Sequence, residues 1–346
     1  MTYANMAVPS RALHLWRYTP WARIHPTSVE DLPSSTPVRW EVREGATLEK
    51  GVPSVAASDD IARVFLSEIG TTGHTLSLSG ELPTIHIHAV ASGHAAVGRL
   101  HLKINTDATV IVHLSGEATW AGVHITGQVG DNVRFGFGLV NELSANSKLL
   151  RCEDWSLGRD ADVQHASLSM GGFRCKNDLR TRFTATGTRF TQAVSVHGRD
   201  QRHVDHHIEI HHDVERTDSS LNVHAACDDR SHSIATGLLT IAKKANHCDA
   251  GQVFKNLLLS EKARAEAIPE LEVLADEVAA AHGAASAPLD LDQMHYLMSR
   301  GLDRSEAASL IVEGFMHHGF STISNKTLVE EMRTRLTVHL ECELKR

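Results

Sequence analysis

The sequence lacks the cysteine pairs that mark metal ribbons, redox sites and disulfide scaffolds. Its five cysteines are spread over 346 residues, and no two form a Cys-x-x-Cys pair. This pattern excludes a zinc ribbon and a thioredoxin-type site. The odd number and wide spacing are typical of free thiols in a reducing compartment, so we expect a cytoplasmic protein.

Long apolar runs and an excess of basic residues are also missing. No run reaches the ~18 apolar residues of a membrane span, and the first residues, MTYANMAVPSRALHLW, do not resemble a signal peptide. Lysine and arginine number 34 against 42 acidic residues, which gives a net charge of −8. Because phosphate binding needs a basic surface, we expect neither a nucleic-acid nor a membrane partner.

Enzyme signatures are absent as well. The sequence contains no G-x-x-x-x-G-K-[ST], no G-x-S-x-G and no H-E-x-x-H motif. We therefore expect a protein that is not an enzyme.

Three segments with different patterns follow one another along the chain. Residues 1–75 predict an irregular helical cap, with a helix over IARVFLSEIG that Ser58, Asp59 or Asp60 can cap and Gly70 ends. Residues 76–288 alternate apolar and polar side chains, as in TIHIHAV, which indicates half-buried strands. Such strands fit a sandwich, a jelly roll or a parallel β-helix, and the spacing alone leaves these alternatives open.

Residues 289–346 predict a helical tail. A short helix over DQMHYLMSR is followed by an Asp303-x-x-Glu306 capping box. The helix after this box is expected to bury four apolar side chains: Ala307, Leu310, Ile311 and Phe315. A third helix starts near Asn325 and repeats apolar residues every four positions: Leu328, Met332, Leu336 and Leu340.

Histidine is unusually frequent, with 24 copies, and it is concentrated in RHVDHHIEIHHDVE. Read as a strand, this segment places six polar side chains on one face: His203, Asp205, His207, Glu209, His211 and Asp213. His206 and His212 lie on the other face with aliphatic residues. Because His207 and His211 are roughly 13 Å apart along a strand, they cannot share one metal without help from neighbouring strands. A solvated or interface-forming face, a transient metal-handling surface and a closed metal site all remain open.

The segment PELEVLADEV predicts another alternating strand over residues 270–278, which runs into alanine-rich sequence around His282. Taken alone, a single histidine beside Gly283 is more often a structural residue than a ligand.

Several ordered blocks together resemble the SufB/SufD family of iron–sulfur cluster assembly proteins. These blocks are NLLLS, PELEVLADEV, HGA, LDLDQMHYLMSRGL and EAASLIVEGF, preceded by HVDHHIEIHHDVERTDSS and by ATGLLTIAKKANHCDAGQ. WRYTP near the start resembles an element typical of the D-type subunit. A series of blocks in order over more than a hundred residues is far more specific than any single motif.

The resemblance implies a mainly β fold, a right-handed parallel β-helix with N-terminal and C-terminal helical regions. It implies a cap over residues 1–75, a core over 76–288 and an ATPase-docking helical domain over 289–346. It also implies a non-catalytic scaffold that pairs with a SufB-type subunit and binds a SufC-type ABC ATPase. No tightly bound cofactor is expected, although iron or a cluster can be handled transiently at the subunit interface.

Individual residues follow from the same resemblance. His282 matches the D-subunit histidine of cluster assembly, and imidazole is a suitable iron ligand. Ala280 stands where many D subunits have a cysteine, and Gly283 and Phe254 or Lys255 stand near the places of the B-type glutamate and cysteine. These departures favour a D-type subunit. The expected ATPase-docking residues lie in the last two blocks: Leu297, Gly301, Leu310, Ile311, Gly314 and Phe315.

Two other functions compete with this one. The histidine-rich strand suits a metallochaperone-like protein, with His203, Asp205, His207, His211 and His212 as candidate ligands. The carboxylates of the same face suit a β-helix enzyme that acts on polysaccharides. The sequence also leaves open whether the chain pairs with itself instead of a sister subunit.

Overall fold

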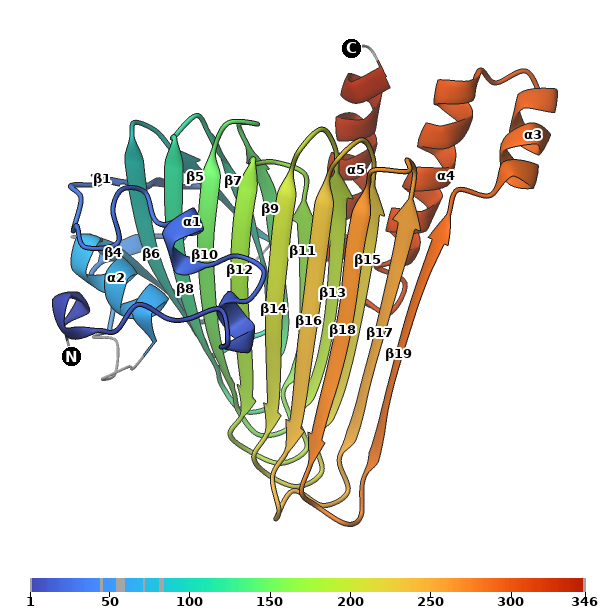
Figure 1. Ribbon diagram of the computed structural model, residues 1–346. Helices are drawn as coiled ribbons and strands as arrows, with labels where there is room; N and C mark the ends of the chain where they lie inside the picture. The colour runs from blue at the N-terminus through green and yellow to red at the C-terminus, as the bar shows by residue number, and fades with distance from the viewer. Residues whose placement is uncertain (1, 44–45, 54–59, 71, 81–83, 345–346) are drawn as a thin grey trace.

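The computed structural model describes residues 2–43, 46–53, 60–70, 72–80 and 84–344. Its body is a parallel β-helix, in which the chain passes alternately through two facing sheets (Figure 1). This confirms the expected fold class and excludes the sandwich and the jelly roll, whose strands are antiparallel.

The even-numbered strands form most of a ten-stranded sheet. Its members are β1 (Thr36–Pro37), β3 (Leu48–Lys50), β4 (Gly73–Leu78), β6 (Ala95–Ile104), β8 (Trp120–Val129), β10 (Lys148–Leu157), β12 (Arg174–Phe183), β14 (His203–His212), β16 (His232–Ile241) and β18 (Arg264–Val273). The odd-numbered strands from β5 onward, together with β2, form a nine-stranded sheet. Its members are β2 (Arg39–Arg43), β5 (Ile85–Ala91), β7 (Ala108–Gly116), β9 (Arg134–Leu143), β11 (Asp162–Ser169), β13 (Arg189–Gly198), β15 (Asp218–Cys227), β17 (Asp249–Leu258) and β19 (Ala279–Pro288).

Side chains of alternate residues fill the space between the sheets. On β10, for example, Leu149, Trp155 and Leu157 point into this core, and Leu149 lies in register with Ala121 of β8 and Cys175 of β12. Because paired residues of parallel strands share a face, the same columns of side chains recur from turn to turn. The core is therefore continuous along the β-helix.

The N-terminal segment covers the outer face of the ten-stranded sheet (Figure 1). It contains two 3-10 helices, η1 (Tyr3–Asn5) and η2 (His14–Trp16), and two α-helices, α1 (Trp21–Ile24) and α2 (Ile61–Ile69). The predicted helix is α2. Asp60 caps it by accepting a hydrogen bond from the backbone N–H of Arg63, and Gly70 follows its last residue. The other two proposed caps, Ser58 and Asp59, lie outside the described residues.

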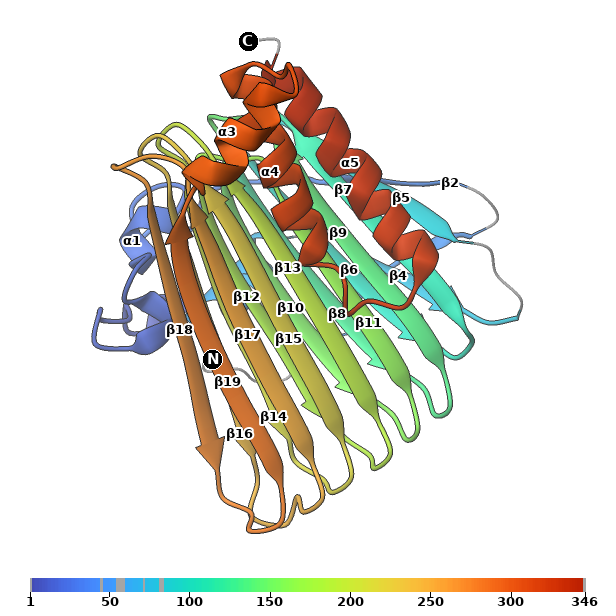
Figure 2. The same cartoon turned by 90° about the vertical axis from the view of Figure 1, so that its right-hand side faces the viewer.

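Three C-terminal helices, α3 (Leu291–Ser299), α4 (Arg304–His318) and α5 (Lys326–Leu344), complete the chain. Figure 2 shows α4 and α5 lying across the outer face of the nine-stranded sheet. The capping box of Asp303 and Glu306 is present at the start of α4. The predicted third helix is α5, and its four-residue repeat is buried: Leu328, Met332, Leu336 and Leu340.

The predicted buried face of α4 is partly wrong. Ala307 is buried, but Leu310 is 48% exposed, while Ile311 and Phe315 are only half-buried. The side chains that pack under the helix are Ala307, Val312 and Met316 instead. The helix is turned so that Leu310 faces away from the sheet.

The strand predicted over residues 270–278 is also partly wrong. The strand β18 ends at Val273, and residues 274–278 form the connection to β19. These last two strands are the edges of their sheets, so each lacks a partner on one side among the described strands. The β-helix therefore ends in an open turn, where Val273 and Leu274 are exposed.

All five cysteines are free, and four of them are buried. In the part of the chain that the structure describes, no helix is both long and apolar enough to cross a membrane. The domain limits at 75/76 and 288/289 stay predictions.

Candidate functional site

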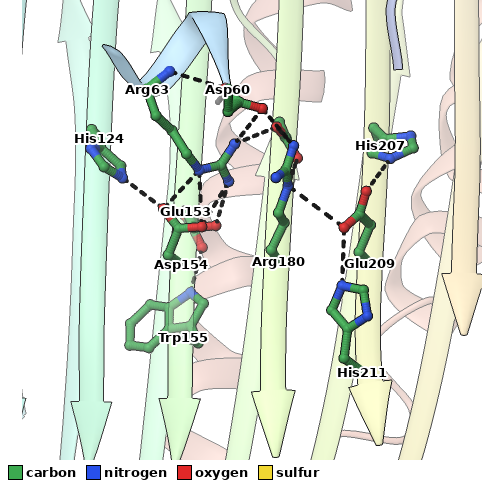
Figure 3. Close-up of polar contacts among 11 residues, drawn as sticks. Asp60, Arg63, His124, Glu153, Asp154, Trp155, Arg180, His207, Glu209 and His211 are labelled. Atoms are coloured by element: carbon green, nitrogen blue, oxygen red, sulfur yellow. Dashed lines mark hydrogen bonds and ion pairs between the residues drawn. The ribbon is translucent and has the colours of Figure 1, made fainter. Parts of the chain in front are cut away.

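A network of charged side chains lies between α2 and the outer face of the ten-stranded sheet (Figure 3). Arg63 points from α2 toward the strands, and its guanidinium lies 2.5 Å from Asp178 and 2.8 Å from Asp154. It also lies 3.4 Å from its own helix cap, Asp60. Arg63 is buried, so these carboxylates supply the charge pairing that burial of a guanidinium requires.

The network continues across β12 and β14 (Figure 3). Arg180 lies 2.8 Å from Asp178 and 3.7 Å from Glu209. Glu209 accepts hydrogen bonds from the Nε2 atoms of His207 at 2.8 Å and His211 at 3.0 Å. Burial alone would raise the pKa of Glu209, but the two histidines and Arg180 outweigh it and lower that pKa. The structure thus brings His207 and His211 together through the carboxylate between them.

The WRYTP segment packs on the start of the histidine-rich strand β14. Thr19 lies 2.9 Å from Nε2 of His203 and donates a 2.7 Å hydrogen bond to Asp205. Asp205 also pairs with Lys176 at 3.0 Å, and the Lys176 ammonium lies 5.9 Å from the centre of a Trp16 ring. Burial lowers the pKa of His203 to about 4, so its imidazole is neutral at pH 7.

Much of the polar face of β14 is therefore an internal contact, since Asp205 is 2% and His207 is 4% exposed. A solvated face is a wrong description of this part of the strand. Among the described residues, the histidines and carboxylates of β14 do not converge into a group of three that would suit a metal ion. The structure gives the metallochaperone alternative no ligand cluster here.

His212 belongs to the opposite face and points into the core between the sheets. Its Nδ1 lies 2.7 Å from Thr217 and its Nε2 lies 2.8 Å from Ser219. The ring stacks on Phe183, with 4.5 Å between ring centres. Burial lowers the pKa of His212 to about 4, which is typical of a neutral core histidine.

The carboxylates of β14, and Asp213 directly after it, do not form the acid–base pair of a glycan-cleaving enzyme. Such an enzyme needs one carboxylic acid whose pKa is raised. Glu209 instead has a lowered pKa, Asp205 is tied to Lys176, and Asp213 pairs with Arg182 at 2.5 Å. This face therefore lacks the general acid that the alternative requires.

His282 lies on β19, at the open end of the β-helix. It is exposed and in register with Gln252 of β17, a buried residue whose side-chain N–H donates to the Glu270 carbonyl at 2.9 Å. Ala280 shares the face of His282, since the two residues are two positions apart on one strand. The structure thus places His282 among the residues of the exposed final turn and apart from the β14 histidines.

The expected docking residues lie on α3, α4 and the turn between them. Gly301 has a φ of +98°, a left-handed conformation that glycine adopts readily, and it ends α3. Three of these residues are exposed, namely Gly301, Leu310 and Gly314. Three others are half-buried, namely Leu297, Ile311 and Phe315.

The sequence did not predict a buried ion pair inside the β-helix. Arg151 and Glu153, both on β10, are paired at 2.5 Å, and Arg151 reaches across the core to Ser167 of β11 at 2.7 Å. Glu153 also accepts hydrogen bonds from Trp155 and His165, each at 2.8 Å. Burial would raise the pKa of Glu153, but Arg151 and His165 lower it to about 2. In LLRCEDWSL no alternation marks these residues as inward-pointing, so only the strand register reveals them.

Comparisons with known proteins agree with this architecture. Residues 87–315 match the family described as "SUF system FeS cluster assembly, SufBD core domain". An iron–sulfur cluster assembly SufBD family protein of Mycobacterium tuberculosis is 27% identical over 361 residues, which cover 97% of this chain and 89% of that protein. The iron–sulfur cluster assembly protein SufD of Bacillus subtilis is 27% identical over 263 residues, or 75% of this chain and 57% of that protein.

The SufD of Escherichia coli matches a shorter stretch, with 29% identity over 108 residues, or 31% of this chain and 26% of that protein. The family match covers well over half of the chain, and it coincides with most of the β-helix and with α3 and much of α4. The chain therefore belongs to the SufBD family of iron–sulfur cluster assembly proteins.

Proposed function

We propose that this chain is a SufD-type, non-catalytic scaffold subunit of a cytoplasmic Suf machine. It pairs with a SufB-type subunit through the open end of its β-helix and binds a SufC-type ABC ATPase through α3 and α4. It holds no resident cofactor, and iron or a nascent cluster is cargo at the subunit interface. The same open end is the surface that a homodimer would use.

The observation that carries this proposal is the unpartnered final turn. An edge strand presents a row of free backbone N–H and C=O groups, which invite pairing with a strand of another chain. Here two edge strands, β18 and β19, end the two sheets together, and Val273 and Leu274 are exposed beside them. His282 lies on this same turn, where a partner would cover it.

The proposed ATPase surface is supported by exposed apolar side chains on α3 and α4. These side chains are Leu291, Tyr296, Met298 and Leu310. By contrast, the apolar repeat of α5, from Leu328 to Leu340, faces the sheet. Deleting residues 290–346 would also remove Met316 and Leu336 from a packed cluster, so point substitutions test docking more cleanly than truncation.

Co-purification of the tagged chain from its host tests the partners directly. We expect wild type to recover a SufB-type protein and an ABC ATPase. Leu310→Glu should lose the ATPase, and Val273→Glu should lose the SufB-type partner, because each places a charge in an apolar contact. Val338→Glu is the matched control, since Val338 is exposed on α5 outside both surfaces. Recovery of both partners by Leu310→Glu and Val273→Glu would contradict the proposed surfaces.

We expect His282→Ala to lower cluster formation by about tenfold, because it removes a proposed iron ligand. The subunits should still assemble, since His282 is exposed and fills no core position. The measurement is cluster formation by the purified complex, followed by absorbance, with size-exclusion chromatography to check assembly. His94→Ala, an exposed histidine at the other end of the β-helix, serves as the control. Unchanged cluster formation in His282→Ala would remove this residue from the site.

A further inference from the structure

Three possible metal ligands from distant parts of the chain meet on the outer face of the nine-stranded sheet. His86 lies on β5, His113 on β7 and Glu331 on α5. One ligand atom of each lies within 4.8 Å of the others, which is the only such group in the described part of the chain. The three side chains line a pocket of about 420 Å³.

The distances in this group fit a shared cation better than they fit hydrogen bonds. His86 Nδ1 lies 3.5 Å from His113 Nε2, which in turn lies 3.5 Å from Oε1 of Glu331. Good hydrogen bonds between such groups are roughly 2.7–3.2 Å long. Two ligands of a tetrahedral ion with bonds of about 2.1 Å are roughly 3.4 Å apart. Both contacts therefore have the spacing of neighbouring ligands.

The surroundings leave these ligands available. Two arginines line the same pocket. Arg335 on α5 forms a short ion pair with Glu142, and Arg43 on β2 lies in register with His86. Within the described ranges, Glu331 has no lysine or arginine at salt-bridge distance, so its charge is not already neutralised. His88 stacks on His113, with 5.1 Å between ring centres, and holds that ring in place. The His113 ring is also buried.

We propose that His86, His113 and Glu331 form a binding site for a divalent transition-metal ion. Two imidazoles and one carboxylate are a donor set that suits zinc or ferrous iron, and the pocket leaves a position open to water. The bound ion joins α5 to β5 and β7 and thereby fixes the last helix to the first turns of the β-helix. This site lies at the opposite end of the sheet from His282. It does not depend on the proposed Suf partners.

Zinc titration of the full-length chain tests the site. The protein is first stripped with a chelator, and ZnCl₂ binding is then followed by calorimetry and by the melting temperature. We expect one tight equivalent and a rise in melting temperature, because the ion binds the folded state alone. Glu331→Gln should lower the affinity at least about tenfold and abolish the rise. Glu330→Gln, an exposed neighbour on the same helix, should behave as wild type.

A second substitution and a spectroscopic probe guard against ambiguous results. His86→Gln changes a half-buried side chain and should give the same loss if Glu331→Gln does not fold. Because the chain has other histidines, cobalt(II) replaces zinc in a parallel titration. Its visible bands should be intense in wild type, as in four-coordinate sites, and weak in both variants. Zinc binding that is absent in wild type, or equally tight in both variants, would overturn the proposal.

Discussion

The charges under the N-terminal segment are compensated one by one. Arg63 is buried, yet two strands supply it with Asp154 and Asp178, and the helix cap Asp60 faces both Arg63 and Arg180. A buried ion pair adds little net stability against an apolar replacement of the whole pair, but removing one partner leaves the other uncompensated. The network should therefore respond strongly to single substitutions.

We expect Arg63→Met to lower the free energy of unfolding by about 3 kcal/mol, because Asp154 and Asp178 lose their shared buried partner. Urea unfolding followed by circular dichroism measures the change. Arg189→Met is the control, because Arg189 is exposed and lies 3.9 Å from an exposed Asp218. That control should stay within about 0.5 kcal/mol of wild type. Equal effects of the two substitutions would mean that the buried network is not strongly coupled to folding.

At the residue scale, the two-residue period predicted correctly which β14 side chains share a face. It separated His207 and His211 from His212, as the structure does. It could not predict what covers each face. The contact that buries Asp205 comes from Thr19, 186 residues away, and local periodicity carries no information about so distant a partner.

At the scale of elements, α5 is the C-terminal helix that the sequence predicted best. Its repeat of Leu328, Met332, Leu336 and Leu340 faces a cluster that includes Ile111 and Val140 of the sheet. The start of α4 was equally clear, because a capping box is a local signal. The buried face of α4 was not predicted correctly. The sequence of α4 is apolar on several sides, and the position of the sheet decides which side is buried.

We expect Leu336→Ala to destabilise the protein by about 2–5 kcal/mol, since it removes a fully buried side chain between α5 and the sheet. Val338→Ala, on the same helix but 46% exposed, should change stability by less than about 0.5 kcal/mol. Thermal or urea unfolding of the two variants gives the comparison. Similar small losses in both would show that α5 contributes little to the stability of the β-helix.

At the scale of the whole molecule, the sequence predicted strands but not their arrangement. Strands of a two-residue period occur in sandwiches and in β-helices alike. What distinguishes the β-helix is pairing between residues such as Leu149 and Cys175, one full turn apart. The sequence contains no strict repeat with this spacing. The β-helix was therefore predicted only from the resemblance of the ordered blocks to the SufB/SufD family.

The protein also buries histidines, in the core of the β-helix and between β15 and α4, which makes the stability of the whole molecule depend on pH. Burial lowers the pKa of His206 to about 3 and those of His212 and His224 to about 4, against an ordinary value of 6.5. Between about pH 6.5 and 4 the unfolded chain binds protons that the folded chain does not. The contribution of these neutral histidines to the free energy of unfolding should therefore be fully present above pH 6.5 and decrease as the pH drops toward 4.

The test is a series of urea unfolding curves from pH 7.5 to 4.5. Each histidine that stays neutral in the folded state adds a slope of up to about 1.4 kcal/mol per pH unit. His206→Met should reduce that slope, because His206 is fully buried and its Nδ1 has no hydrogen-bond partner in the described structure. His94→Met, which changes an exposed ring, should leave the slope as in wild type. If His206→Met and wild type lose stability in parallel as the pH falls, the buried histidine is not the origin of the acid sensitivity, and the carboxylates of the ion-pair networks are the next groups to substitute.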